Sequence, residues 1–279
     1  MANLLRTLVY GGQISLTLAD TTAMVREAIK LHNLSRSSAT VLGKSLSLMT
    51  FMSVCLKGEK GEISLSVKTD GAGGDIGVSG NRRLFLRGYI TDPFVEDATE
   101  KETFGTNGSL TVIRDDGYSR PFVGTCALNE NGSIDEAFTE YYRISEQLPT
   151  YLKTAVEFDD KGALVFAGVA VLQPLPFADK EILEKVEKTP LQALLDGTKE
   201  KGVEACAKDY FAVDETVWET REALYKCNCS REYLTRVLVT LGKEQMHEII
   251  KADGEIKIHC HYCNKDYQFT EEDERKIFP

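Results

Sequence analysis

The chain has 279 residues and 42% of them are hydrophobic, which is enough for one large or two modest domains with a buried core. Its formal net charge of −10 argues against a protein that wraps nucleic acid, because such binding depends on clustered Lys and Arg. The apolar stretch near the N-terminus is interrupted by Arg6, Gly11 and Gln13, so it predicts neither a signal peptide nor a membrane span. We therefore expect a soluble, cytoplasmic protein with no membrane partner.

Alternating apolar residues predict a β-hairpin near the N-terminus, with strands over residues 5–10 and 14–18 and a turn at Gly11-Gly12. Asp20-Thr21-Thr22 is typical of a helix start, and the helix that follows should end near His32.

A longer helix is expected from Ser37 or Ser38 to Leu56, and its apolar residues predict that it lies in the core. Gly43-Lys44-Ser45, within this helix, lacks the earlier glycine that a phosphate-binding loop requires. We therefore interpret Lys44 and Ser45 as exposed helix positions.

From Glu62 to about Leu172 the pattern is mostly that of strands, with one helix expected around residues 134–145. Pro174 and Pro176 should close the last strand, because proline cannot donate to a strand ladder. The boundary of the main domain is expected near Ala178. The strands predicted from apolar alternation cover residues 63–67, 84–86, 110–112 and 164–171.

Residues 179–226 differ in composition, because 20 of these 48 residues are charged, against 27% for the whole chain. Their apolar residues are thinned to single stripes, which predicts a helical linker that depends on docking for its order. Two stripes are expected to dock on different faces: one contains Ile182, Leu183, Val186 and Leu191 to Leu195, and the other contains Val217, Trp218, Leu224 and Tyr225. The chain as a whole is predicted to be α+β: a sheet-rich domain with packed helices (1–178), the helical linker (179–226) and a small zinc-binding domain (227–279).

Two close cysteine pairs, Cys227 with Cys229 and Cys260 with Cys263, predict a zinc site with four thiolate ligands. Zinc would provide folding energy that so small a module lacks. The first pair is Cys-x-Cys, whereas zinc ribbons usually have two residues within each pair. A disulfide across one intervening residue should be strained and easily reduced, which suits a sensor. A purely structural zinc site remains the alternative.

The other chemistry-bearing residues predict no catalytic site. Cys55, Cys126 and Cys206 are interpreted as packed thiols whose roles the sequence does not define. His259 and His261 flank Cys260; either could replace a sulfur on zinc, but tuning of the thiolate is the preferred interpretation. Residues 226–279 carry nine Lys and Arg against ten Asp and Glu, so a zinc ribbon that reads nucleic acid is not favoured.

The sequence resembles the redox-regulated 33 kDa heat-shock chaperone family, also called 33 kDa chaperonins. The resemblance covers nearly the whole chain. It is carried by Cys227-Asn228-Cys229-Ser230-Arg231-Glu232, Leu241-Gly242-Lys243-Glu244, Cys260-His261-Tyr262-Cys263-Asn264, Arg6 to Gly12, Asp20-Thr21-Thr22, Leu56-Lys57-Gly58, Gly88-Tyr89-Ile90 and Ser145-Glu146-Gln147-Leu148-Pro149.

This resemblance implies an ATP-independent holdase, not an enzyme, which is inactive while reduced and zinc-bound and is activated by oxidation to bind unfolding proteins. The implied zinc ligands are Cys227, Cys229, Cys260 and Cys263, and a homodimer is possible after oxidation. We expect oxidation to pair Cys227 with Cys229 and Cys260 with Cys263, because short loops close at the smallest entropic cost. The alternative is a constitutive zinc-ribbon module that binds nucleic acid or protein.

Overall fold

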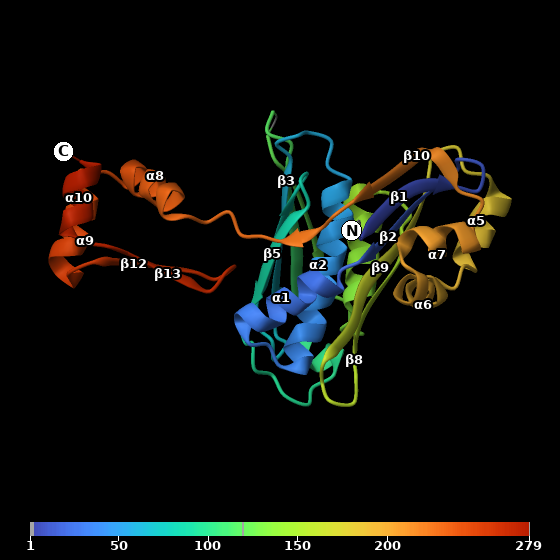
Figure 1. Ribbon diagram of the computed structural model, residues 1–279, viewed down its shortest axis with the longest axis horizontal. Coiled ribbons are helices and arrows are strands. Elements are labelled where there is room, and N and C mark those ends of the chain that lie inside the picture. Colours follow the sequence, from blue (N-terminus) through green and yellow to red (C-terminus); the bar gives the residue numbers. More distant parts are fainter. Residues whose placement is uncertain (1–2, 119, 279) are drawn as a thin grey trace. The chain divides into compact units, whose positions relative to one another are not determined.

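The computed structural model describes residues 3–118 and 120–278. Its contacts divide the chain into two compact units, Met1–Tyr225 and Lys226–Pro279, called here the main unit and the C-terminal unit (Figure 1). Helices and strands are mixed in both, and the main unit is rich in sheet, so the predicted α+β class is confirmed.

The first sheet of the main unit is antiparallel and has the strand order β10-β1-β2-β9-β8. The predicted N-terminal hairpin is confirmed, since Leu5 pairs with Leu18 and Val9 with Ile14. Gly11 and Gly12 have positive φ values of 66° and 85°, which explains the two glycines at this turn. The strands are β1 (Leu4–Val9), β2 (Ile14–Asp20), β8 (Tyr151–Phe158), β9 (Leu164–Pro174) and β10 (Asp214–Arg221).

The second sheet has the strand order β11-β5-β4-β3-β6-β7, in which β11 runs parallel to β5 and the other pairs are antiparallel. In β3 the apolar residues Ile63, Leu65 and Val67 are buried and alternate with more exposed residues, as the sequence predicted. The strands are β3 (Glu62–Thr69), β4 (Ile76–Asn81), β5 (Phe85–Ile90), β6 (Gly108–Asp115), β7 (Phe122–Ala127) and β11 (Leu224–Tyr225).

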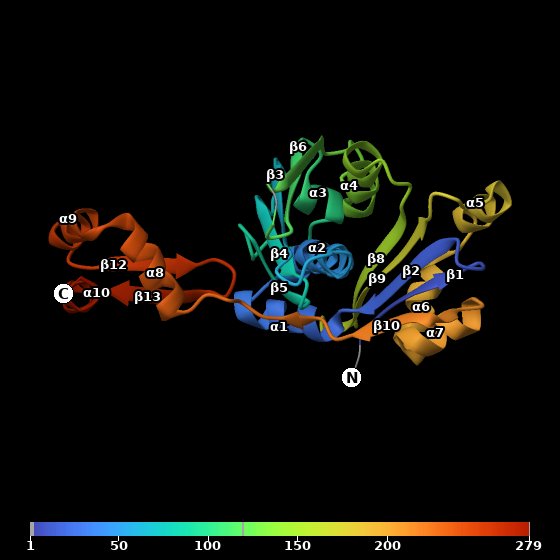
Figure 2. The same cartoon turned by 90° about the horizontal axis from the view of Figure 1, so that it is seen from above.

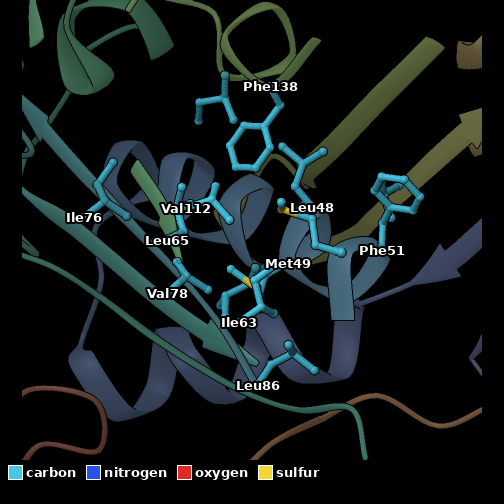
Figure 3. Packing of buried hydrophobic residues seen from close by; sticks show 14 of the residues in the cluster. Leu48, Met49, Phe51, Ile63, Leu65, Ile76, Val78, Leu86, Val112 and Phe138 are labelled. Atoms are coloured by element: carbon cyan, nitrogen blue, oxygen red, sulfur yellow. The ribbon is translucent and has the colours of Figure 1, made fainter. Parts of the chain in front are cut away.

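Helix α2 (Arg36–Val54) lies between the two sheets, as Figure 2 shows, and all of its residues except Arg36, Thr40 and Lys44 are buried. Its side chains share one apolar core with both sheets and with α4 (Ile134–Tyr141), part of which is drawn in Figure 3. Its position as a core helix is therefore confirmed. The other helical segments on this side are α1 (Thr22–His32), α3 (Glu100–Phe104) and a π-helical turn over Tyr142–Glu146 that continues α4.

Lys44 and Ser45 on α2 are not exposed, so that expectation was wrong. Ser45 is fully buried, and its hydroxyl donates to the carbonyl of Val41 one turn earlier. Lys44 has a side chain that is only 13% exposed, and its ammonium lies 2.6 Å from a carboxylate oxygen of Glu100. Most of this helix is enclosed between two sheets, so its buried polar groups find partners inside the protein.

Helices α5 (Lys180–Glu187), α6 (Leu191–Lys201) and α7 (Val203–Tyr210) form a further layer; α6 and α7 pack on the outer face of the first sheet. Val186, Leu194 and Leu195 are buried there in a second apolar cluster, together with Ile14 and Leu16 of β2. The predicted docking of the first stripe is thus confirmed. Because helices cover both faces, β2 is buried along almost its whole length.

The second part of the expected helical linker is not helical. Residues 214–221 form strand β10, which pairs with the free edge of β1, for example Arg221 with Leu4. Thr216, Val217 and Trp218 are β-branched or aromatic residues that favour strands, and an available sheet edge outweighed their helical spacing. The contacts group residues 179–225 with the main unit, and separate behaviour of residues 1–178 stays a prediction.

Candidate metal centre

The C-terminal unit is small, and its buried apolar core consists of five side chains. Strands β12 (Ile256–Cys260) and β13 (Lys265–Phe269) form a hairpin, and helices α8 (Arg231–Leu241), α9 (Lys243–Asp253) and α10 (Glu271–Ile277) complete the unit. The buried core residues are Leu238, Met246, Ile250, Ile256 and Phe269.

The second cysteine pair lies in the turn of this hairpin. Cys260 ends β12, and its carbonyl accepts hydrogen bonds from the backbone N–H groups of Cys263 at 3.2 Å and Asn264 at 2.8 Å. Asn264 has a φ of 53°, a left-handed conformation that asparagine tolerates better than most residues. This tight turn brings the two thiols of the pair together.

The first pair precedes α8 in a segment with no regular secondary structure. Ser230 caps α8 by accepting a hydrogen bond from the N–H of Tyr233 at 3.1 Å, so the helix begins directly after Cys229. Arg231, in the first turn, pairs with Asp273 at 2.7 Å and lies 4.4 Å from the ring centre of Phe269. These contacts fix the start of α8 against β13 and α10, and with it the position of the first pair.

The structure brings all four predicted ligands together, with every sulfur within 4.8 Å of the others. The Cys227 and Cys260 sulfurs are 3.8 Å apart, and the Cys229 and Cys263 sulfurs are 3.0 Å apart. Four sulfurs at about 2.3 Å from a tetrahedral zinc would be separated by about 3.8 Å. All seven cysteines of the chain are described, and each is a free thiol. The donor set and its spacing therefore fit a thiolate-bound metal.

The four thiols do not have equivalent electrostatic environments. Burial raises the pKa of Cys229, but hydrogen bonds from Cys263 and from the hydroxyl of Tyr267 outweigh it and bring that pKa down to about 7. Burial is the main cause that raises the pKa of Cys227 and of Cys263. Cys229 thus deprotonates more readily than Cys227 or Cys263, which favours metal binding and also reaction with oxidants.

Tyr267 is a site residue that the sequence analysis missed. Its hydroxyl lies 3.3 Å from the Cys229 sulfur, and it reaches the site from β13, where it pairs with Ile258 of β12. Tyr267 lies four residues beyond Cys263, so only the hairpin register identifies it.

The neighbouring histidines are not members of the ligand cluster in the described residues. The Nδ1 atom of His259 lies 2.7 Å from a carboxylate oxygen of Asp266, and its ring packs edge-on against that of His261 with centroids 5.0 Å apart. Tuning of the Cys260 thiolate by these imidazoles stays a prediction.

The remaining cysteines lie in the main unit and are not members of the cluster. Cys126 and Cys206 are buried and donate weak S–H hydrogen bonds to the carbonyls of Ala137 and Leu194, and Cys55 is half-buried. Burial raises the pKa of all three, to about 11 for Cys126. Their interpretation as packed thiols agrees with these environments.

A sheet-rich α+β unit followed by a small unit with four converging thiols defines a two-unit protein with a cysteine cluster that could hold a metal. The model of the family described as Hsp33 protein matches residues 2–270. The chain therefore belongs to the Hsp33 family, a family of chaperones, and the resemblance stated from the sequence is confirmed.

Relatives named 33 kDa chaperonin support this membership. The protein from Bacillus cytotoxicus is 31% identical over 289 residues, covering 98% of this chain and 97% of the relative. The one from Bacillus cereus strain AH187 is 32% identical and covers 97% of this chain and 96% of the relative. The crystal structure of the Thermotoga maritima 33 kDa chaperonin matches with a TM-score of 0.80 at 26% identity, over 99% of this chain and 97% of that chain. Among the helices in the described residues, none combines the length and apolarity that crossing a bilayer requires.

Proposed function

We propose that the chain is a redox-regulated, ATP-independent holdase chaperone that acts in the cytoplasm by binding and not by catalysis. In this proposal it is inactive while reduced and zinc-bound, and oxidation activates it. The observation that carries the proposal is the convergence of four free thiols in a unit whose described residues form a buried apolar cluster of five side chains. So small a core makes the fold of the C-terminal unit dependent on the metal.

Cys227, Cys229, Cys260 and Cys263 would hold one zinc ion, which when bound supplies folding free energy to the unit. Structural zinc contributes on the order of 10–16 kcal/mol in small modules, more than five buried side chains provide after conformational entropy is paid. Loss of the metal would therefore unfold the C-terminal unit.

Oxidation by a peroxide would convert four thiols into two disulfides, with release of four protons and four electrons and reduction of two peroxide molecules to water. All four sulfurs start within 4.8 Å of one another, so distance alone does not select the pairs. The pairing of Cys227 with Cys229 and of Cys260 with Cys263 follows from the smaller loops that these bonds close once the unit unfolds. Each disulfide removes two ligands from the metal.

The client-binding surface would come from apolar side chains that are covered in the reduced form. Helices α5 to α7 cover Ile14, Leu16 and Leu18 on the first sheet, while their own Leu194 and Leu195 are buried against it. Release of these helices would expose both sides of this cluster to segments of unfolding client proteins. A homodimer in the oxidised state would follow from the same exposed surface, and nucleic acid is not a partner in this proposal.

The test is suppression of client aggregation by reduced and by peroxide-treated protein, without ATP. We expect activity only after oxidation, accompanied by zinc release, and reversal by a reductant. Cys55→Ser is the matched control, because it removes a thiol outside the cluster and should preserve the switch. A protein that acts while zinc-bound and loses activity when zinc leaves would be the constitutive zinc-ribbon module instead.

A further inference from the structure

The last residues of the main unit, 221–225, connect its two sheets. Strand β10 ends at Arg221 in the first sheet, and β11 begins at Leu224 in the second. Ala223, between them, is 2% exposed and belongs to the core shared by both sheets. Cys227 follows Tyr225 by two residues, so any unfolding that starts at the metal centre reaches this segment first.

The backbone pairing of this segment is short. β11 has two residues and pairs in parallel with β5, and the N–H of Leu224 donates to the carbonyl of Leu84 at 3.0 Å. Parallel pairs are slightly less stable per residue than antiparallel ones, and two residues make few bonds. Backbone pairing alone would hold the end of the main unit weakly.

The side chain of Asn3 adds a second attachment. Its Nδ2 donates to the carbonyl of Ala223 at 3.2 Å, and its Oδ1 accepts from the N–H of Ala223 at 2.8 Å. The backbone N–H of Asn3 donates to the carbonyl of Arg221 at 3.0 Å. The amide side chain thus replaces a strand residue at the point where the chain leaves β10, and both polar groups of buried Ala223 are satisfied.

The hydroxyl of Tyr225 provides the third attachment. It donates to the carbonyl of Gly88 at 2.8 Å and accepts from the N–H of the same residue at 3.3 Å. The Nε2 atom of His32, at the end of α1, lies 2.9 Å from the same oxygen. The hydroxyl is therefore hydrogen-bonded to both backbone groups of Gly88 and lies within hydrogen-bond distance of His32.

Two arginines lie beside this segment, and the Nη2 atom of Arg221 donates a hydrogen bond to the carbonyl of Arg82. The guanidinium groups of Arg82 and Arg221 both approach the same carboxylate oxygen of Glu219, each at 3.6 Å. The Nη1 atom of Arg221 is buried without a hydrogen bond, and burial, with the nearby charge of Arg82, lowers the pKa of Arg221. Departure of β10 would return the buried Nη1 of Arg221 to water, but it would also break the hydrogen bond to Arg82 and the ion pair between Arg82 and Glu219.

We propose that Asn3 and Tyr225 form a clamp that holds residues 221–225 on the main unit and sets how much oxidant is needed to release β10 and helices α5 to α7. The inference rests on the proposed function, in which that release exposes the client surface. The clamp makes activation a two-step event: loss of the metal unfolds the C-terminal unit, and release then requires the clamp to open. Asn3 and Tyr225 are positioning residues, since neither contacts the metal centre or a client.

Tyr225→Phe in the full-length protein tests the clamp, because it removes the hydroxyl and keeps the ring. We expect unchanged zinc content in the reduced protein. After zinc removal by a chelator under reducing conditions, amide hydrogens of β10 should exchange about tenfold faster than in the unmodified chain, which corresponds to ~1.4 kcal/mol. Less peroxide should be needed for half-maximal suppression of aggregation. Asn3→Asp removes one donor from the Ala223 contact and should shift both readouts in the same direction, which gives a second variant if the first does not fold.

Two controls separate the clamp from general stability. Tyr210→Phe removes the hydroxyl of an exposed tyrosine on α7 and should change neither readout. Val67→Ala destabilises the second sheet at a fully buried position and should lower the melting temperature without selectively speeding exchange in β10. Exchange in β10 that is unchanged by Tyr225→Phe, or a peroxide shift that Val67→Ala reproduces, would overturn the clamp. The exchange measurement needs no client, so it stands even if oxidised protein proves inactive and the proposed function fails.

Discussion

The main unit and the C-terminal unit differ in what stabilises them. The main unit has one apolar core that extends across α2 and both sheets, and a second beneath α5 to α7. The C-terminal unit has five buried apolar side chains and a cluster of four thiols. In the first, burial of apolar surface provides the folding energy; in the second, the proposed zinc ion would supply what the core lacks. Oxidation of the four thiols should therefore unfold the C-terminal unit and leave the main unit folded.

Substitution of a proposed zinc ligand should have the largest effect on zinc content and on the fold of the C-terminal unit. Cys229→Ser or Cys263→Ser removes one of four sulfurs, so we expect loss of zinc and unfolding of the C-terminal unit while the main unit keeps its melting transition. Metal analysis and circular dichroism measure the two outcomes, with one zinc per chain expected in the unmodified protein. Full zinc retention in Cys229→Ser together with loss in Cys55→Ser would refute the assigned ligand set.

A matched pair of core substitutions, one in each unit, should have an intermediate effect on zinc affinity and on stability. Phe269 in the C-terminal unit and Phe104 in the main unit are both almost completely buried, and Phe→Ala at such positions costs about 3–5 kcal/mol. If zinc binding and folding of the C-terminal unit are linked as proposed, Phe269→Ala should weaken zinc binding by roughly two to four orders of magnitude. Phe104→Ala should lower the melting temperature of the main unit and leave zinc affinity unchanged. Competition with a chelator measures this, and equal loss of affinity in both variants would contradict the comparison.

The smallest expected effect is on how the stability of the main unit depends on pH. Burial raises the pKa of Asp135, although Lys44 and hydrogen bonds from Thr154 oppose it. The folded state therefore binds more protons than the unfolded state between the unfolded pKa and the raised folded pKa. The contribution of Asp135 to stability falls as pH rises through this window and is restored as pH falls. Asp135→Asn should remove this component from a plot of unfolding free energy against pH, and identical slopes in both proteins would contradict it.

The sequence predicts most of the features that depend on residues close together in the chain. The hairpin at Gly11-Gly12 and the core helix α2 follow from periodicity, and the four ligands follow from cysteine spacing. What it missed depends on distant pairing: β10 needed the free edge of β1, Tyr267 needed the register of the β12–β13 hairpin, and the contact between Asn3 and Ala223 joins residues 220 positions apart. Intrinsic preferences for strands are weak and depend on context, which is why residues 214–221 were predicted to be helical.

Hydrogen exchange on reduced, zinc-loaded protein and on peroxide-oxidised protein tests the central claim most directly, because it reports on each unit separately. After oxidation, we expect fast exchange throughout the C-terminal unit. Fast exchange should also extend into the part of the main unit that precedes Tyr225, in β10 around Trp218 and in α6 around Leu194. Ile63 to Val67 in β3 should remain protected. Oxidised protein that suppresses aggregation while α6 and β10 stay as protected as in the reduced form would contradict the account.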